Sequence, residues 1–315
     1  RERGRPKEIV IIGCGSSYNA AMLGKYYFES ISKIPTSIYR PSEFIFFNQN
    51  LKKVLYIFIS QSGETADTCD LIESNKKFFK DSLSIVNNVD SRLVKNTKDS
   101  INLSLGIEKG VAATKTFTGQ IAILHLMSFC FNEGSKVTIP KLDLDYKTFF
   151  NVEEDVKKIA EKFYKAKNFF ILGRNFTYPI ALEAALKIKE ISYIHSEGSL
   201  SSEMKHGPIA LLDNNFPILY LLSNDKSTVL KEIMNLYEAH TRSKKIILFA
   251  TTGSIKLIDP EFLSQIEFIS IPEKTPSVLP FYFTLLAQLL SYHLAKLNNL
   301  SIDQPRNLAK VVTVA

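Results

Sequence analysis

The sequence has few cysteines, and they lack the spacing of structural ones. Its 315 residues include Cys14, Cys69 and Cys130, and no two of them form a CxxC pair. An odd, widely separated set argues against a disulfide framework and against a zinc site. A chain of this length buries a sufficient core without disulfides. We therefore expect a reducing, cytoplasmic compartment, no metal and no cofactor.

Long hydrophobic runs are also missing. The longest apolar stretch, residues 121–130, is well short of the roughly 20 residues that a membrane span needs. The basic start, residues 1–7, is not followed by the apolar segment of a signal peptide. We expect no membrane partner. Because the first residue is Arg rather than Met, we also expect a piece of a longer protein.

The formal net charge of +7 comes mainly from lysines scattered over helical stretches. Binding of nucleic acid would require a concentrated basic patch with aromatic platforms or a recognisable module, and neither is present. The scattered charge is typical of solvated helix faces. It remains compatible with an anionic small substrate.

The chain repeats itself at a spacing near 160 residues. Each half contains three short apolar runs, read as buried strands, with helical stretches between them. The paired runs are residues 9–13 and 169–173, 54–60 and 218–223, and 83–86 and 246–249. Continuous apolar strands that alternate with helices predict a parallel sheet covered on both faces.

Two α/β domains follow from this repeat, at residues 1–150 and 151–315. We place the link between the halves near residues 132–155, with a helix that starts near Val152. Ligands of open parallel sheets bind at the carboxyl ends of the strands, so the residues after each strand are the candidates for a site.

The turn after the second strand is unusually polar. Ser60, Gln61, Ser62 and Thr65 crowd a glycine-containing turn at the predicted start of a helix. One hydroxyl is enough to cap a helix, whereas four hydrogen-bonding side chains with a helix N-terminus favour a phosphate cradle. The pattern GxxxxGK[ST] is missing, which argues against a nucleoside triphosphate. The matching residues of the second half are Ser223 and Thr228.

The other polar segments are less specific on their own. The turn at residues 13–17 carries Ser17 and precedes a helix, and it reads equally as an anion site or a plain turn. Lys187 and Glu190 share a helix face, either as a surface ion pair or near the core. His206 lies in a predicted loop before Gly-Pro, where it could exchange protons near neutral pH. Residues 303–310 form a polar segment that reads as an ordered loop.

Together these segments resemble the sugar-isomerase half of glucosamine-6-phosphate synthase, the family also called glutamine–fructose-6-phosphate aminotransferase. The resemblance runs from about Ile9 to the last residue. It rests on residues 60–67, 110–115, 187–195, 205–208 and 303–310. It implies two tandem sugar-isomerase (SIS) subdomains, each a five-stranded parallel sheet between helices in a flavodoxin-like αβα sandwich. It also implies a homodimer with sites shared between subunits.

The resemblance assigns a role to each matched residue. Ser60, Gln61, Ser62 and Thr65 would hold the sugar phosphate. Contacts to the sugar would come from Ser17, Val111, Ala113 and Ala309. Glu190 would move a proton between C1 and C2, with Lys187 beside it. His206 would open the sugar ring from the partner subunit, and Lys310 would approach the open-chain carbonyl as an amine nucleophile.

Some features depart from the family. Ala113 stands where the family often has Ser, so one hydroxyl contact to the sugar is in doubt. The second half has a Ser-poor turn, so one phosphate cradle per chain is expected. The glutaminase domain, which in this family lies upstream and releases ammonia, is absent from these 315 residues.

The expected function is therefore conversion of fructose-6-phosphate to glucosamine-6-phosphate, in the hexosamine route to UDP-N-acetylglucosamine, with ammonia from the missing domain. A stand-alone deaminase or deglycase of amino-sugar phosphates is the alternative enzyme. A non-catalytic SIS module that senses phosphosugars is the alternative of another class.

Overall fold

The computed structural model describes residues 5–44, 53–131 and 147–311. The chain divides into two compact units, Arg1–Lys141 with Ala309–Ala315, and Leu142–Leu308. The sequence predicted a division at residue 150 and placed the last residues in the second unit. They group with the first because the Lys310 ammonium is hydrogen bonded to Glu108. Most of the expected link, residues 132–146, lies outside the described residues.

Within its described residues, the first unit holds a five-stranded sheet in the order β2-β1-β3-β4-β5, with every pairing parallel. Its strands are β1 (Glu8–Gly13), β2 (Thr36–Tyr39), β3 (Val54–Ser60), β4 (Ser82–Val86) and β5 (Asp99–Asn102). Every residue of β3 and β4 is buried. This is the burial expected of a parallel sheet with both faces covered.

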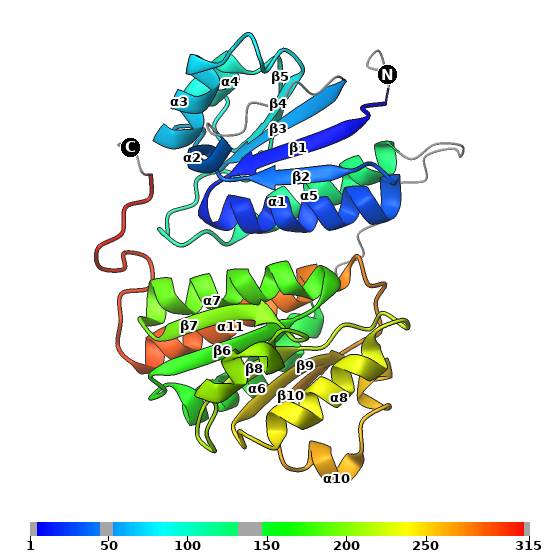
Figure 1. Ribbon diagram of the computed structural model, residues 1–315. Coiled ribbons are helices and arrows are strands. Elements are labelled where there is room, and N and C mark those ends of the chain that lie inside the picture. The colour runs from blue at the N-terminus through cyan, green and yellow to red at the C-terminus, as the bar shows by residue number, and fades with distance from the viewer. Residues whose placement is uncertain (1–4, 45–52, 132–146, 312–315) are drawn as a thin grey trace. The chain divides into compact units, whose positions relative to one another are not determined.

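Helices cover both faces of this sheet (Figure 1). They are α1 (Gly15–Tyr27), α2 (Pro41–Phe44), α3 (Ala66–Ser74), α4 (Arg92–Asn96) and α5 (Lys115–Cys130). On one face, α1 and α5 pack together. On the other, Cys69, Leu71 and Ile72 of α3 join side chains of β1 and β3 in one apolar core.

The described part of the second unit repeats this plan with the order β10-β9-β8-β6-β7, again parallel throughout. Its strands are β6 (Asn168–Gly173), β7 (His195–Leu200), β8 (Ile218–Leu221), β9 (Ile246–Thr251) and β10 (Glu267–Ile271). The predicted fold class is confirmed, including all six strands expected from the repeat. The four strands that were not predicted are shorter or more exposed, so they lack a continuous apolar run. They are β2, β5, β7 and β10.

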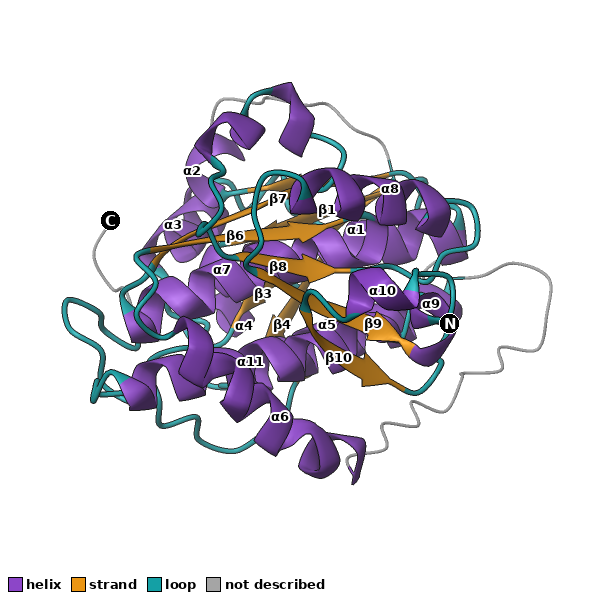
Figure 2. Cartoon of the chain, turned by 90° about the horizontal axis from the view of Figure 1, so that it is seen from below, coloured by secondary structure: helices purple, strands orange, loops and turns teal. Residues whose placement is uncertain are grey.

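The helices of the second unit also lie on both sheet faces, as Figure 2 shows with strands in orange and helices in purple. They are α6 (Lys147–Phe163), α7 (Tyr178–Ser192), α8 (Val229–His240), α9 (Thr252–Ile255), α10 (Pro260–Leu263) and α11 (Leu279–Leu297). Helix α11 contacts both α6 and α7. Helix α8 packs on the opposite apolar core. Helix α6 begins at Lys147, earlier than the predicted start near Val152, so residues 147–151 belong to the helix and not to the link.

Each sheet has a point at which the chain reverses its direction across the strands. In the first unit this point lies between β1 and β3, and in the second between β6 and β8. Loops that leave such neighbouring strands in opposite directions open a crevice at the carboxyl ends. The Ser/Thr turn follows β3 and therefore stands at the carboxyl end of the sheet, next to this point of reversal.

Candidate functional site

The Ser/Thr turn after β3 brings the predicted hydroxyls together. The Ser60 and Thr65 hydroxyl oxygens are 3.1 Å apart, and Ser60 Oγ accepts the Gly63 N–H at 2.9 Å. Ser62 Oγ accepts the N–H of Glu64 at 3.1 Å. Thr65 caps α3 without a side-chain hydrogen bond to the helix. Capping therefore does not consume these hydroxyls, and they remain grouped at a positive helix end.

Gly63 makes this turn sterically possible. Its φ is +69°, in the left-handed region, and an added Cβ would come 2.1 Å from Ser91 Oγ. A side chain at this position would be strained and would also clash. The Gln61 side-chain amide makes no hydrogen bond within the described part of the chain. It is available to a ligand at the edge of the turn.

Neighbouring loops are tied to this turn through Asn87, which follows β4. Asn87 donates its backbone N–H to Gln61 O at 3.0 Å and accepts the Leu105 N–H at 3.0 Å. Its side-chain amide donates to Gly106 O at 2.7 Å. The loops after β3, β4 and β5 therefore form one hydrogen-bonded rim at the carboxyl end of the sheet.

Ser17 lies in the first turn of α1, which follows β1 at the same carboxyl end of the sheet. It is buried, and its hydroxyl accepts a hydrogen bond from Gln120 Nε2 of α5 at 3.1 Å. The carbonyl oxygen of Gln120 is buried and has no hydrogen-bond partner among the described residues. A buried amide oxygen without a partner is costly, which is consistent with a group built to meet a ligand hydroxyl.

Lys310 is held in the first unit by the loop after β5. Its ammonium lies 2.6 Å from Glu108 Oε2 and 2.7 Å from the Gly110 carbonyl oxygen. Glu108 in turn accepts the backbone N–H groups of Thr114 and Thr116 at 3.0 and 3.1 Å. The carboxylate thus connects the C-terminal segment to the start of α5.

The charge on Glu108 is maintained by these contacts. Burial raises the pKa of Glu108, but the Lys310 ammonium and the hydrogen bonds from Thr114 and Thr116 outweigh it and hold the pKa below its ordinary value. Glu108 is therefore an ionised partner that fixes the position of the Lys310 amine. Two residues expected at the sugar, Val111 and Ala113, lie half-buried in the same loop.

In the second unit, helix α7 carries a buried cluster of charges. Lys187 Nζ lies 2.5 Å from Glu190 Oε2 and 3.4 Å from Glu183 Oε1. The Lys187 side chain is 3% exposed and that of Glu183 is 2% exposed, whereas Glu190 keeps 21%. This decides between the two readings of the pair: it lies at the core and not on the surface. Glu190 is the member that reaches solvent.

The two carboxylates keep Lys187 protonated. Burial alone would lower the pKa of Lys187, but Glu183 and Glu190 raise it above its ordinary value. A permanent ammonium then lies against Glu190. It can orient that carboxylate and stabilise negative charge that develops beside it.

The remaining predicted residues lie elsewhere on their units. His206 ends a short 3-10 helix (Met204–His206), is exposed, and makes no side-chain hydrogen bond within the described residues. Ala309 is exposed next to Lys310. The polar C-terminal segment is ordered, since Arg306 N donates to the Tyr193 hydroxyl at 2.7 Å and its guanidinium stacks 4.3 Å above that ring.

Three functional candidates were missed by sequence reasoning, namely Glu108, Gln120 and Glu183. Glu108 precedes a loop of small residues, and in the sequence it looks like an ordinary charged residue of an exposed loop. Gln120 lies inside the apolar helix α5, and a polar residue in such a helix is itself an indication of a functional position. Glu183 stands four residues before Lys187, which is the spacing of a helical ion pair.

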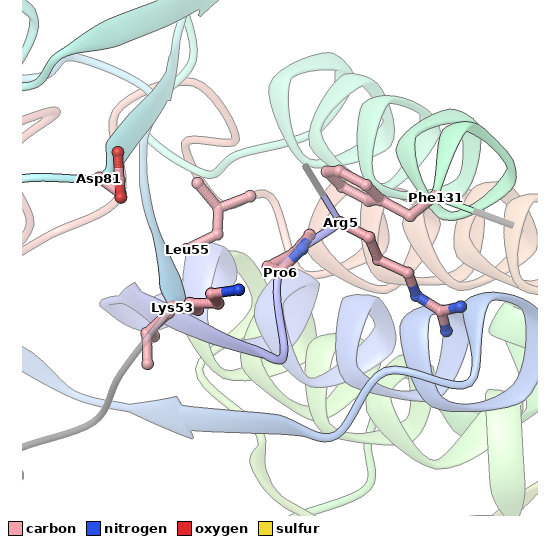
Figure 3. Close-up of a pocket in the computed structure, with 7 residues that line it drawn as sticks. Arg5, Pro6, Lys53, Leu55, Asp81 and Phe131 are labelled. Atoms are coloured by element: carbon pink, nitrogen blue, oxygen red, sulfur yellow. The ribbon is translucent and has the colours of Figure 1, made fainter. Parts of the chain in front are cut away.

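A pocket of about 310 Å³ lies at the other end of the strands of the first sheet, where β1 and β3 begin (Figure 3). It is lined by residues next to the starts of β1 and β3, among them Pro6 and Leu55, with Phe131 beyond them. Ligands of open parallel sheets bind at the carboxyl ends, so this pocket is not part of the candidate site.

Among residues 5–44, 53–131 and 147–311, no cluster of three or more His, Cys, Asp or Glu side chains could hold a metal ion. In those same stretches, no helix is both long and apolar enough to cross a membrane.

Comparison with known proteins assigns a family. The SIS domain family model matches residues 5–128 and 162–297. The glutamine–fructose-6-phosphate aminotransferase of Aquifex aeolicus is 40% identical over 98% of this chain and 52% of its own length. That of Chlorobaculum tepidum is 37% identical over 98% of this chain and 51% of its own length. The chain spans about half the length of these curated relatives.

Solved structures agree. The C-terminal domain of glucosamine-fructose-6-phosphate aminotransferase from Francisella tularensis has a TM-score of 0.88 and 34% identity, over 96% of this chain and 87% of that one. A glucosamine-6-phosphate deaminase from Thermotoga maritima, at 24% identity and a TM-score of 0.79 over 97% of this chain and 90% of that one, shares the fold. The chain therefore belongs to the SIS domain family, and within it to the C-terminal isomerase domains of the glutamine–fructose-6-phosphate aminotransferases.

Proposed function

We propose that this chain converts fructose-6-phosphate to the glucose configuration at C1 and C2, as the isomerase half of an enzyme that makes glucosamine-6-phosphate. Ammonia would come from an upstream glutaminase domain. The family supports the reaction class, and the length of the relatives supports a missing partner domain. The compartment would be the cytoplasm, where the sugar phosphate is found.

The sugar phosphate is assigned to the turn after β3. A phosphate there would meet the hydroxyls of Ser60, Ser62 and Thr65 and the amide of Gln61, at the N-terminus of α3. Donors of this kind, together with a helix dipole, bind phosphate without a metal. Ser17, Val111, Ala113 and Ala309 are assigned to the sugar itself.

Proton transfer is assigned to Glu190, and one observation carries this role. Glu190 is the partly exposed carboxylate of a buried ion cluster, and it lies 2.5 Å from the permanently charged Lys187. A general base must lie within hydrogen-bonding reach of the substrate, and a neighbouring group must hold it in place. The exposed part of Glu190 meets the first requirement, and its contact with Lys187 meets the second. The ammonium of Lys187 would stabilise the enediolate that forms between C1 and C2.

Two further roles complete the proposal. Lys310 would release its extra proton to solvent, its neutral amine would attack the open-chain C2 carbonyl, and the carbinolamine so formed would lose water to give an imine. Glu108, at 2.6 Å, would position the amine for this attack. His206 would open the ring from the partner subunit of a homodimer, consistent with its exposure and its lack of partners within the described chain.

The test is the substitution Glu190→Gln. It should abolish interconversion of fructose-6-phosphate and glucose-6-phosphate, a loss of at least 10²-fold, because removal of a general base costs about that much. Binding of the sugar phosphate, measured by calorimetry, should stay within a few-fold of wild type. Full retention of turnover would reject the role of Glu190. Binding without turnover by the wild-type chain would favour a phosphosugar sensor.

A further inference from the structure

The second unit has a counterpart of the Ser/Thr turn that the proposed function leaves without a role. Ser223 and Thr228 follow β8 with the same spacing that separates Ser60 from Thr65 after β3. The two strands also hold the same place in their sheets, since β3 adjoins β1 and β8 adjoins β6 at the point of reversal. The second unit therefore places similar donors at its own crevice.

This second turn already holds a carboxyl group, that of Glu232 from the first turn of α8. Glu232 Oε2 accepts the N–H of Ser223 at 3.4 Å, and Oε1 accepts the Thr228 hydroxyl at 3.3 Å. Glu232 is 0% exposed. In the first unit the matching position, four residues after the turn threonine, is Cys69, whose thiol donates to Gly63 O at 3.3 Å.

Several groups around Glu232 are of the kind that anion sites use. The guanidinium of Arg174, which follows β6, favours the charged form of Glu232, whereas burial and the nearby Asp225 favour the neutral form and together prevail. Asn175 Nδ2 lies 3.5 Å from the Thr228 hydroxyl. Backbone N–H, hydroxyl, nearby cation and helix N-terminus are the groups that otherwise receive a phosphate. Here the chain itself supplies the acceptor oxygens.

We propose that Glu232 is an internal substitute for a phosphate group: its carboxyl fills the anion site of the second unit and restricts each chain to one sugar phosphate. This inference rests on the proposed function of the turn after β3. Replacement of Glu232 by the smaller residue of the first unit should free the donors of Ser223 and Thr228. A second phosphate should then bind.

The experiment counts phosphate sites by calorimetry with inorganic phosphate. Wild type should bind one phosphate per chain and Glu232→Cys two. In a Ser62→Ala/Thr65→Ala background, in which the first turn is disabled, wild-type Glu232 should give no binding and Glu232→Cys one site. A further Thr228→Val change should remove that site. Glu232→Ser serves as a second opening variant if the cysteine variant does not fold.

Controls separate the two claims. Glu232→Gln keeps the side-chain shape and should gain no site, and Glu238→Gln on the same helix should behave as wild type. No phosphate bound by folded Glu232→Cys and Glu232→Ser chains, while the wild type still binds one, would overturn the role of Glu232 alone. Failure of the wild type to bind phosphate would instead overturn the proposed function of the first turn.

Discussion

At the scale of single residues, this chain buries charged groups where chemistry is expected and gives each a partner. Lys187 has Glu183 and Glu190, and Lys310 has Glu108. Burial of an unpaired charge would cost several kcal/mol, so each ion is retained only with its counter-ion. Such pairs fix an amine or a carboxylate in one place. That is the requirement for a general base and for a nucleophile.

Glu232 differs, because the groups that lower its pKa do not outweigh the effect of burial, which raises it. Burial raises the pKa of Glu232 to about 8, against the opposing effects of Ser223, Thr228 and Arg174, while Asp225 raises it further. The folded state therefore holds a proton that the unfolded chain releases above its ordinary pKa near 4.5. Stability from this group is fully present below about pH 4.5 and is lost as the pH rises to about 8.

We predict that the free energy of unfolding of the wild type falls between pH 5 and pH 8 relative to Glu232→Gln. The glutamine cannot ionise, so its stability profile should lack this component. The difference should reach several kcal/mol, since each unit of pKa shift corresponds to about 1.4 kcal/mol. Urea unfolding at a series of pH values measures it. Parallel profiles for the two proteins would show that Glu232 titrates normally.

At the scale of elements, the short connection between β3 and α3 carries the proposed phosphate site, and its shape depends on Gly63. We predict that Gly63→Ala destabilises the fold by about 2–3 kcal/mol, from backbone strain and from the collision with Ser91. Phosphate binding should weaken at least tenfold, because the displaced turn would move the backbone N–H of residue 63 away from the Ser60 hydroxyl that it aligns. Denaturant unfolding and calorimetry report the two effects.

Gly106→Ala is the matched control for this prediction. Gly106 also has a left-handed φ, +64°, but an added Cβ would meet nothing within 4 Å. It should show a loss of about 1 kcal/mol from strain and near-normal phosphate binding. Equal behaviour of the two variants would mean that the contact with Ser91 has no role in shaping the turn.

Elements were also the level at which the sequence was most informative. Buried strands such as β3 are continuous apolar runs and could be predicted, because burial on both faces leaves no room for polar residues. Edge strand β5 has three exposed polar residues and a single apolar one, Ile101, and gave no such signal. The start of α6 was placed too late because no Ser, Thr, Asp or Asn stands directly before Lys147 to signal a helix N-terminus.

The candidate site was predictable only where its chemistry is local in sequence. The hydroxyls between Ser60 and Thr65 stand in one turn, so their grouping follows from the chain order. The contact of Lys310 with Glu108 spans 202 residues and depends on the folding of the first unit. The resemblance indicated Lys310, but no pattern in the sequence pointed to Glu108.

At the scale of the whole molecule, the proposed homodimer makes a prediction about subunit mixing. Chains with Glu190→Gln and chains with His206→Ala should each be inactive. If His206 serves the partner subunit, a mixed dimer contains one site with both native residues. Mixing equal amounts and allowing exchange should restore about a quarter of wild-type turnover, since half of the dimers are mixed and half of their sites are intact.

Native mass spectrometry should follow the exchange, so that formation of mixed dimers is established independently of activity. Mixed dimers without turnover would place Glu190 and His206 of the same chain in one site. A chain that stays monomeric at working concentrations would contradict the shared site altogether.

The long separation between Glu108 and Lys310 has a consequence for how the protein is made. During synthesis, Glu108 leaves the ribosome roughly ten seconds or more before Lys310, at ordinary rates of elongation. The first unit can thus build its sheet and its Ser/Thr turn early, while the Lys310 amine arrives last. If the proposed roles hold, a nascent chain can bind a phosphate before it can attack a carbonyl, because that attack requires a chain translated past residue 310.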